Sequence, residues 1–328
     1  MKLIKCLFSS IFFIYCSASL QAAEIHAILV ADTMDGVIHF QTNIDMMQRA
    51  AKRIAAKTGY DLHVAMFEEQ EVRISNIIEY IEKLDVQQED VLFFYINNHG
   101  SRTENKNSQW PTLSFCIEKA LHPEQYELDF AILNEALKNK NAHLLISMAE
   151  ACNVISSNDD FFKKDEKDDE DDEDDEGAGT EAEFEYWRAT IEQEKGPTHE
   201  YRLAQGDRLL QRLKERTDDD ILELYRRLFV EPYGTVLISS SSPGEAARHG
   251  LFTPLFLDYF CTSTFFFADI ETKSNPWKTI LDKTKHAVQK RWEQEAMEGK
   301  QKTQTVQYEL QLNYKNGTCH HLPSYYEL

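Results

Sequence analysis

The sequence predicts an α/β fold with a largely parallel central sheet. Segments typical of strands alternate along the chain with segments typical of amphipathic helices, which is the pattern of a parallel sheet covered by helices. One strand, at residues 91–96, is the unbroken run VLFFYI, which suits a strand buried on both faces. In sheets of this class, functional groups gather at the carboxyl ends of the strands.

The first part of the chain supplies four of the expected strands and three helices. Apolar residues recur at helical spacing after the first strand, at Ile44, Met47, Ala51 and Ile54, and Gly59 ends that helix. The expected strands are residues 24–32, 60–67, 91–96 and 142–148. The expected helices are residues 42–58, 72–84 and 128–137, and the polar residues 102–111 are expected to form a loop.

The second part continues the alternation after a charged interruption. A helical, highly charged stretch is expected at residues 184–229, followed by the strand GTVLI at residues 234–238 and the turn SSSSPG. Helices are expected at residues 256–267 and 277–297. The last expected strand is the alternating segment TQTVQYELQL at residues 303–312.

The charge of the chain is strongly negative and unevenly distributed. The formal net charge is −21, and residues 159–176 alone contain thirteen acids and three lysines. A run of this kind repels itself, so we expect a solvated, disordered loop there. Nucleic acid is excluded as a partner, because binding phosphates requires a basic surface.

The N-terminus has the composition of a secretory signal peptide. A short basic start is followed by the eleven apolar residues CLFSSIFFIYC and then by the small residues SASLQAA. The apolar stretch is too short to span a bilayer, so we expect export and cleavage near Ala22. Cleavage removes Lys2 and Lys5 and no acids, which leaves a net charge of −23.

Four cysteines remain after cleavage: Cys116, Cys152, Cys261 and Cys319. An exported protein could pair them, but their spacing does not decide the connectivity. If Cys152 is a working thiol, at least one of the other three must also be free.

Two predicted strands end in chemically reactive residues. The third strand is followed by His99-Gly100, and the fourth by Glu150-Ala151-Cys152. Adjacent parallel strands would bring these ends together, and an imidazole close to a thiol can take its proton and later protonate a leaving amine. Taken separately, a cysteine at a strand end is more often a small buried residue, and a histidine is more often structural. Their occurrence at consecutive strand ends favours a Cys–His dyad.

Three sequence blocks resemble the caspase and metacaspase group of cysteine peptidases. They are DVLFFYINNHG, HLLISMAEAC and GTVLISSSSPGEAARHGLFTPLF, and QTVQYEL is a weaker fourth block in which Val306 stands where proline is usual. The resemblance implies a three-layer α/β/α sandwich with a mostly parallel central sheet. Together with the signal peptide (1–22) and the acidic run, it divides the chain into a large-subunit-like part with the dyad (23–157), an acidic and helical insertion (158–232), a small-subunit-like part (233–314) and a C-terminal tail (315–328).

The resemblance also assigns roles to residues. His99 would be the general base and Cys152 the nucleophile, and the N–H groups of Gly100 and Cys152 would form the oxyanion hole. The chain departs from the metacaspase pattern at two places. Asn98 stands where glycine is usual, and Cys152 is followed by Asn-Val-Ile rather than by His-Ser-Gly.

Acidic residues near the dyad predict the specificity. Glu150 stands where metacaspases have an aspartate and accept Arg or Lys, and a carboxylate in a substrate pocket attracts a cationic side chain. Asp45 falls near a second acidic pocket position, although a solvent-facing helix acid explains it equally well. Glu150 could instead form an internal ion pair. Ser240 and Ser241 are expected to line the substrate groove, with a plain turn as the alternative.

No metal ligands are predicted, and no cofactor is required. Calcium stays open, because some metacaspases depend on it, but the acidic run lacks the spacing of a dedicated calcium loop. His249-Gly250 is a second His-Gly pair without a preceding strand, and His320-His321 beside Cys319 is a weak metal motif in an expected flexible tail.

Together these features predict an exported, periplasmic or secreted, cysteine endopeptidase that cleaves proteins or peptides after Arg or Lys. The alternative is a catalytically inactive caspase-like protein that binds partners through its acidic insertion. Lys163, Lys164 and Lys167 lie at the start of that insertion, so self-cleavage there is a further hypothesis.

Overall fold

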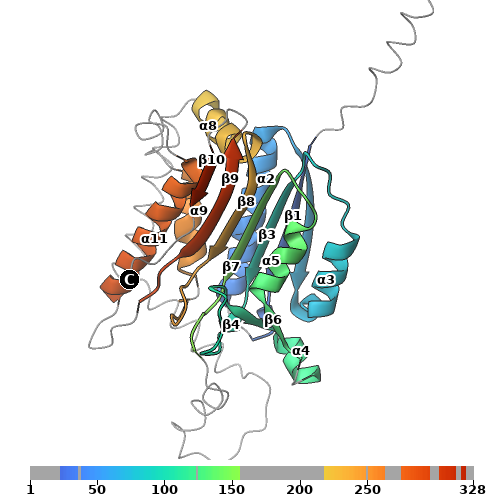
Figure 1. Cartoon of the computed structure of the whole chain (residues 1–328), viewed down its shortest axis with the longest axis vertical. Helices are drawn as coiled ribbons and strands as arrows, with labels where there is room; N and C mark the ends of the chain where they lie inside the picture. The colour runs from blue at the N-terminus through green and yellow to red at the C-terminus, as the bar shows by residue number, and fades with distance from the viewer. Residues whose placement is uncertain are drawn as a thin grey trace, which may run out of the picture.

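The central element is a seven-stranded sheet with the strand order β10-β9-β8-β7-β3-β1-β2 (Figure 1). This computed structural model describes residues 23–35, 38–122, 125–155, 218–248, 250–262, 275–295, 303–314 and 319–322. The strands are β1 (Glu24–Ala31), β2 (Asp61–Glu68), β3 (Val91–Asn97), β7 (Leu144–Glu150), β8 (Pro232–Ser239), β9 (Gln307–Tyr314) and β10 (Cys319–Leu322).

Four of the six strand pairings in this sheet are parallel and two are antiparallel. β2, β1, β3, β7 and β8 run in one direction, whereas β9 is antiparallel to β8, and β10 is antiparallel to β9. Parallel neighbours need a crossover connection, which helices between the strands provide. The mostly parallel sheet of the predicted fold class is therefore confirmed.

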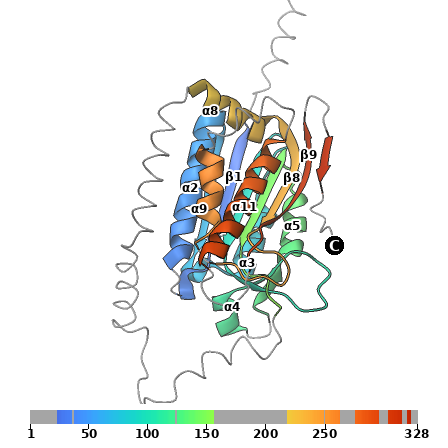
Figure 2. The ribbon, with the colours of Figure 1, turned by 90° about the vertical axis from the view of Figure 1, so that its left-hand side faces the viewer.

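Helices cover both faces of the sheet, so the molecule has three layers (Figures 1 and 2). One outer layer packs on the side of Tyr95 and consists of α2 (Ile38–Thr58), α8 (Asp218–Tyr225), the π-helix η3 (Arg226–Val230), α9 (Phe252–Thr262) and α11 (Pro276–Glu295). The other layer packs on the side of Phe94 and includes α3 (Ile74–Lys83) and α5 (Phe130–Lys138). Short helices α4 (Cys116–Leu121), η1 (Thr33–Asp35) and η2 (Glu69–Glu71) complete the described elements.

The two faces explain the unbroken apolar run at β3. Every residue of β3 is buried, and alternate side chains join opposite hydrophobic clusters: Phe93 and Tyr95 one, Leu92, Phe94 and Ile96 the other. A strand between two helical layers must be apolar on both sides, because its side chains alternate between the faces.

Most predicted elements are present with shifted ends. The helix expected at residues 256–267 is α9, four residues earlier, and the strand expected at 303–312 is β9, which begins at Gln307. Residues 303–306 instead form an extended connection that side chains of a neighbouring loop hold in place. At the start of α11, Asn275 Oδ1 accepts the N–H of Trp277 at 3.0 Å, and Pro276 occupies the first helical position, where no N–H is needed.

A small second sheet was not predicted. β4 (His99–Ser101), β5 (Thr112–Ser114) and β6 (Glu127–Asp129) form an antiparallel three-stranded sheet at the carboxyl end of β3. Strands of three residues carry too little periodicity to be recognised. His99, expected directly after the third strand, is therefore the first residue of a further strand.

Several predictions fall outside the described residues. They are the signal peptide at 1–22, the acidic run at 159–176, His249, and most of the helix expected at 184–229, of which residues 218–229 are described. Cys319–Leu322, expected in a flexible tail, form strand β10. Within the part of the chain that the structure describes, no helix combines the length and apolarity needed to cross a membrane.

A substitution at Gly234 tests how closely β8 and β9 pack. Its φ is +126°, and a Cβ on it would lie 2.0 Å from the carbonyl oxygen of Gln311 in β9. We expect Gly234→Ala to lower the free energy of unfolding by more than about 3 kcal/mol, because backbone strain and a clash act together. Gly59→Ala is the control, since Gly59 has φ +76° with nothing within 4 Å, and we expect it to cost about 1–2 kcal/mol. Equal losses in urea denaturation would contradict this account.

Candidate active site

The pairing of β3 with β7 brings the two reactive strand ends together. Asn97 and Glu150, the last residues of the two strands, are register partners in a parallel ladder. The pairing continues beyond the strands, since the Asn98 N–H donates to the Glu150 carbonyl at 3.1 Å and the Arg102 N–H to the Val154 carbonyl at 2.8 Å. Residues 98–102 and 150–155 thus run side by side, as predicted for the segments that carry His99 and Cys152.

Gly100 is the point of closest approach between these segments. A Cβ at this position would lie 2.4 Å from the Cys152 carbonyl oxygen and 3.0 Å from the Ala151 Cβ. Since real Cβ atoms do not approach other atoms this closely, only glycine fits beside Cys152 here. The glycine that follows the histidine is required by this contact.

His99 is half-buried at the start of β4, where it pairs with Ser114. The ring of His99 meets the ring of Phe40, from α2, edge-on with centroids 5.7 Å apart. Its backbone N–H donates to the side-chain oxygen of Asn98 at 2.7 Å. Asn98, where the resemblance leads us to expect glycine, is fully buried and is bonded both to His99 and to Glu150, so it fixes the turn that presents the histidine.

The Cys152 thiol lies beneath the loop that follows β8. Its Sγ is 3.3 Å from the Ala247 nitrogen, which donates to it, and 3.5 Å from the Ala247 carbonyl oxygen. Burial raises the pKa of the Cys152 thiol, and the hydrogen bond with the Ala247 backbone only partly opposes this. Burial therefore disfavours the thiolate form of Cys152 in this arrangement. The Cys152 N–H donates to no acceptor among the described residues, which leaves it available to a ligand.

Ser240 and Ser241 hold the backbone of Ala151, the residue before Cys152. The Ser240 hydroxyl accepts the Ala151 N–H at 3.1 Å, and the Ser241 hydroxyl donates to the Ala151 carbonyl at 2.7 Å. Both serines are fully buried. They act on the backbone of the Cys152 segment, whereas the sequence predicted that they line the substrate groove.

Asn153 and Glu245 fasten the loop over the thiol. The Asn153 N–H donates to the Glu245 carbonyl at 2.9 Å, and the Gly244 N–H returns to the Asn153 carbonyl at 2.7 Å. The Glu245 carboxylate accepts the Thr305 N–H at 2.6 Å and the Thr303 hydroxyl at 2.7 Å. Asn153, where metacaspases usually have histidine, is thus part of the framework that closes residues 242–247 over Cys152.

Glu150 points away from the thiol side, into the layer formed by α2 and α9. It is fully buried, and its Oε2 accepts hydrogen bonds from Asn43 Nδ2 at 3.1 Å, from Tyr95 Oη at 3.1 Å and from the Thr253 hydroxyl. Burial raises the pKa of the Glu150 carboxyl from 4.5 to about 7, against the opposing effect of its hydrogen bonds. No described residue forms the internal ion pair considered for Glu150 from the sequence.

Asn97 places a second buried polar side chain, an amide, beside Glu150. It is fully buried, and among the described residues neither its amide oxygen nor its amide nitrogen has a hydrogen-bond partner. Buried polar atoms without partners are rare and costly, so this cluster suits a polar ligand. Asn97 was missed from the sequence because it reads as the end of an apolar strand; its position in register with Glu150 is the signal that could have revealed it.

Asp45 is not brought to this cluster. It lies on the exposed side of α2, where its Oδ1 is 3.5 Å from Gln41 Nε2. Two residues along a helix correspond to about 200° of rotation, so Asn43 faces Glu150 while Asp45 faces away from it.

The fold and the site define a three-layer α/β protein with a histidine and a cysteine on adjoining segments at the carboxyl edge of a parallel sheet. In structure, the chain is similar to caspase-1 from Spodoptera frugiperda, with a TM-score of 0.39 and 10% identity over 88% of this chain and 86% of that chain. It is also similar to protein GSU0716 from Geobacter sulfurreducens, with a TM-score of 0.41 and 12% identity over 87% of this chain and 92% of that chain. No protein-family model and no curated protein matches the sequence.

Glu245→Ala should expose the thiol. The change removes the hydrogen bonds that tie the loop to Thr303 and Thr305, each worth about 1.5–3 kcal/mol for a charged acceptor. We therefore expect alkylation of Cys152, followed by mass spectrometry of its peptide, to be at least about tenfold faster. Glu135→Ala, at an exposed residue paired only with Lys138 among the described residues, is the control. An unchanged rate in Glu245→Ala would show that the loop does not restrict the thiol.

Glu150 should make the folded state less stable as the pH rises. Its pKa is about 7 in the folded protein and 4.5 ordinarily, so between these values the folded state binds more protons than the unfolded one. We expect the free energy of unfolding to decrease through this window by up to about 3 kcal/mol. Glu150→Gln, which cannot ionise, should remove this decrease in denaturant titrations between pH 4.5 and 8. A slope that Glu150→Gln leaves unchanged would assign the effect to other groups.

Proposed function

We propose that the chain is an exported cysteine endopeptidase that hydrolyses peptide bonds after Arg or Lys through an acyl-enzyme. The observation that carries the proposal is the parallel run of residues 98–102 beside residues 150–155, the two segments that contain His99 and Cys152. The resemblance of the surrounding blocks to caspases and metacaspases gives these two residues their roles.

The first half of the reaction forms the acyl-enzyme. His99 accepts the proton of the Cys152 thiol, and the thiolate attacks the carbonyl carbon of the scissile bond. The N–H groups of Gly100 and Cys152 donate to the oxygen that becomes negative. The imidazolium then gives its proton to the leaving amine, and the carbon–nitrogen bond breaks.

The second half releases the acyl group. His99 takes a proton from water, the resulting hydroxide attacks the thioester, and the thiolate leaves. The thiol is reprotonated by the same imidazole, so the cycle consumes one water for each peptide bond.

The loop of residues 242–247 must move away from the Cys152 sulfur before this reaction begins. In the closed arrangement, Sγ contacts both the nitrogen and the oxygen of Ala247, and burial keeps the thiol protonated. Substrate binding that displaces Ala247 would free the sulfur on the side where the scissile carbonyl must approach.

The buried cluster of Asn97 and Glu150 supports a basic specificity. A cationic side chain that reached this cluster would meet the Glu150 carboxylate and an Asn97 amide oxygen that has no hydrogen-bond partner among the described residues. Its positive charge would favour the ionised form of Glu150, which burial alone disfavours. An acidic side chain would add a like charge there, which costs several kcal/mol.

Fluorogenic peptides that end in Arg, Lys or Asp test the proposal. We expect kcat/KM for the Arg and Lys peptides to exceed that for the Asp peptide by at least about 100-fold. Cys152→Ala should reduce hydrolysis to background, and His99→Ala should reduce it by about 10²- to 10⁴-fold. His122→Ala, which alters an exposed histidine, is the matched control.

The outcomes of this assay distinguish an active cysteine endopeptidase from a catalytically inactive binding protein. Equal background rates in the parent and in Cys152→Ala would contradict the enzyme and favour the binding protein. Activity with a preference for Asp would leave the dyad intact and contradict the role of Glu150. Assays with calcium and with a chelator determine whether calcium is required.

A further inference from the structure

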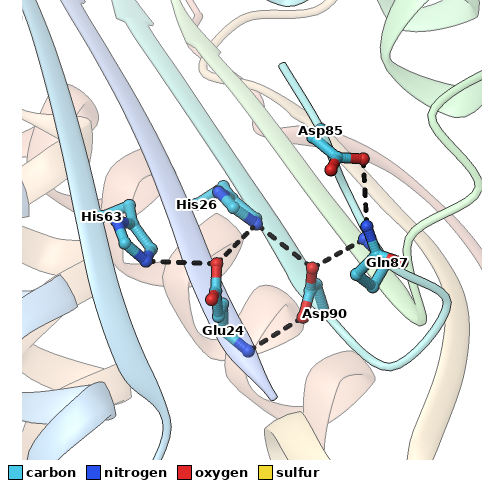
Figure 3. A network of polar contacts seen from close by, with 6 residues as sticks. All are labelled: Glu24, His26, His63, Asp85, Gln87 and Asp90. Atoms are coloured by element: carbon cyan, nitrogen blue, oxygen red, sulfur yellow. Dashed lines mark hydrogen bonds and ion pairs between the residues drawn. The ribbon is translucent and has the colours of Figure 1, made fainter. Parts of the chain in front are cut away.

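A second polar cluster lies at the opposite edge of the sheet from Cys152. Glu24 and His26 are at the start of β1, His63 is on β2, and Asp90 directly precedes β3 (Figure 3). β1 lies between β2 and β3, so the three strands contribute side chains from neighbouring positions. His26 is the register partner of His63.

The nitrogen and oxygen atoms of the cluster converge. His26 Nε2 is 3.2 Å from Asp90 Oδ2 and 3.5 Å from Glu24 Oε2, and His63 Nε2 is 3.1 Å from the same Glu24 oxygen. One ligand atom each from Glu24, His26 and Asp90 lies within 4.8 Å of the others. In a tetrahedral site with bonds of about 2.0–2.2 Å, ligand atoms are about 3.3–3.6 Å apart. The separations among Glu24, His26 and Asp90 are therefore close to those of a metal site, whereas His63 Nε2 lies near Glu24 alone and must move to join the ligand set.

The carboxylate oxygens around His26 outnumber the N–H donors that its ring can offer them. His26 Nε2 carries at most one proton, yet two carboxylate oxygens lie within 3.5 Å of it. The side chains of His26 and Asp90 are 6% and 3% exposed, so water does little to relieve the excess negative charge. His26 Nδ1 is also buried and has no hydrogen-bond partner among the described residues. Two carboxylates and two neutral imidazoles, in contrast, match the charge of a divalent cation.

Backbone groups hold Asp90 in place. The Glu24 N–H donates to its Oδ1 at 2.9 Å, and the Gln87 N–H donates to its Oδ2 at 2.7 Å. The rings of His26 and His63 stack with centroids 5.5 Å apart and an angle of 19° between them. Ligands held by such outer contacts lose little freedom on binding. The mixture of imidazole and carboxylate suits zinc and similar metals, whereas calcium and magnesium prefer oxygen ligands alone.

We propose that Glu24, His26, His63 and Asp90 form a binding site for Zn²⁺ or a similar divalent transition metal. The ion would fasten the amino ends of β1, β2 and β3 and would stabilise the fold. The site is separate from the dyad, which lies at the carboxyl ends of β3 and β7, and the proposal does not depend on the peptidase activity. His63, with its side chain 56% exposed, would swing onto the ion to complete the ligand set.

Zinc binding to the full chain tests the site. The Cys152→Ala variant serves as parent, because a cysteine thiolate can itself bind zinc and would obscure the site. After treatment with a chelator, we expect calorimetric titration with Zn²⁺ to show a site that His63→Ala and Glu24→Gln each weaken by about 10- to 100-fold. His122→Ala should leave the affinity unchanged. Zn²⁺ should also raise the Tm of the parent more than that of either cluster variant.

Cobalt distinguishes this site from the other cysteines and from His320-His321. Co²⁺ bound by imidazole and carboxylate should give the visible bands of a tetrahedral ion without a thiolate charge-transfer band, and His63→Ala should reduce these bands. Equal zinc affinity in the parent and both cluster variants would overturn the proposal, as would a cobalt spectrum dominated by thiolate. Absence of binding in the parent would also overturn it and leave a hydrogen-bonded His–carboxylate cluster. Both variants alter partly exposed side chains, and circular dichroism checks that they fold.

Discussion

The parallel ladder between β3 and β7 is the constraint on which the rest of the site depends. It places Asn97 opposite Glu150, and its continuation through the Asn98 and Arg102 N–H groups carries the register beyond the strands. A shift of one residue would reverse the faces of every side chain in β3 relative to β7. The helical layers on both faces prevent such a shift, because β3 and β7 each contribute alternate side chains to opposite cores.

The same ladder places the Glu150 carboxylate and the Cys152 thiol on different sides of one segment. Side chains that alternate along β7 place Glu150 among α2 and α9, with Tyr95 and Thr253 as its donors. Burial raises the pKa of the Tyr95 phenol well above its ordinary value, so Tyr95 remains a hydrogen-bond donor to Glu150. The backbone of Ala151 and Cys152 faces Gly100 and the serines after β8 instead. One short segment thus presents a carboxylate on one side and a thiol on the other.

The sequence predicted what long-range periodicity and chain order determine. Helices and strands of seven or more residues were recognised, because their apolar residues repeat often enough to identify a face. The juxtaposition of His99 and Cys152 followed, since neighbouring parallel strands end at one edge. The three-residue strands β4, β5 and β6 were missed because they have almost no period.

The contacts of individual side chains were harder to predict than the positions of strand ends. Ser240 and Ser241 read as groove residues, yet their hydroxyls bond to the Ala151 backbone. Asp45 and Asn43 lie two residues apart, and only the helix phase relative to β7 decides which of them faces Glu150. The cluster of Glu24, His26, His63 and Asp90 left no motif, because its members come from three segments that only the sheet brings together.

The pairing of β7 with β8 has a consequence for the integrity of the molecule. The two strands are joined by a parallel ladder from Leu144 with Gly234 to Ala149 with Ser239, although residues 151–231 separate them in the chain. The elements on either side of residues 156–217 share one hydrophobic core, in which Tyr95 and Met148 belong with Phe252 and Trp277. Breaking one peptide bond between Ile155 and Asp218 would therefore yield two polypeptides that behave as the subunits of a heterodimer, with an interface as large as the core of a domain. Such fragments would separate in denaturant but migrate together under native conditions. The fold is thus held together by the shared core and the β7–β8 ladder, and an intact chain between the two parts is not needed for it.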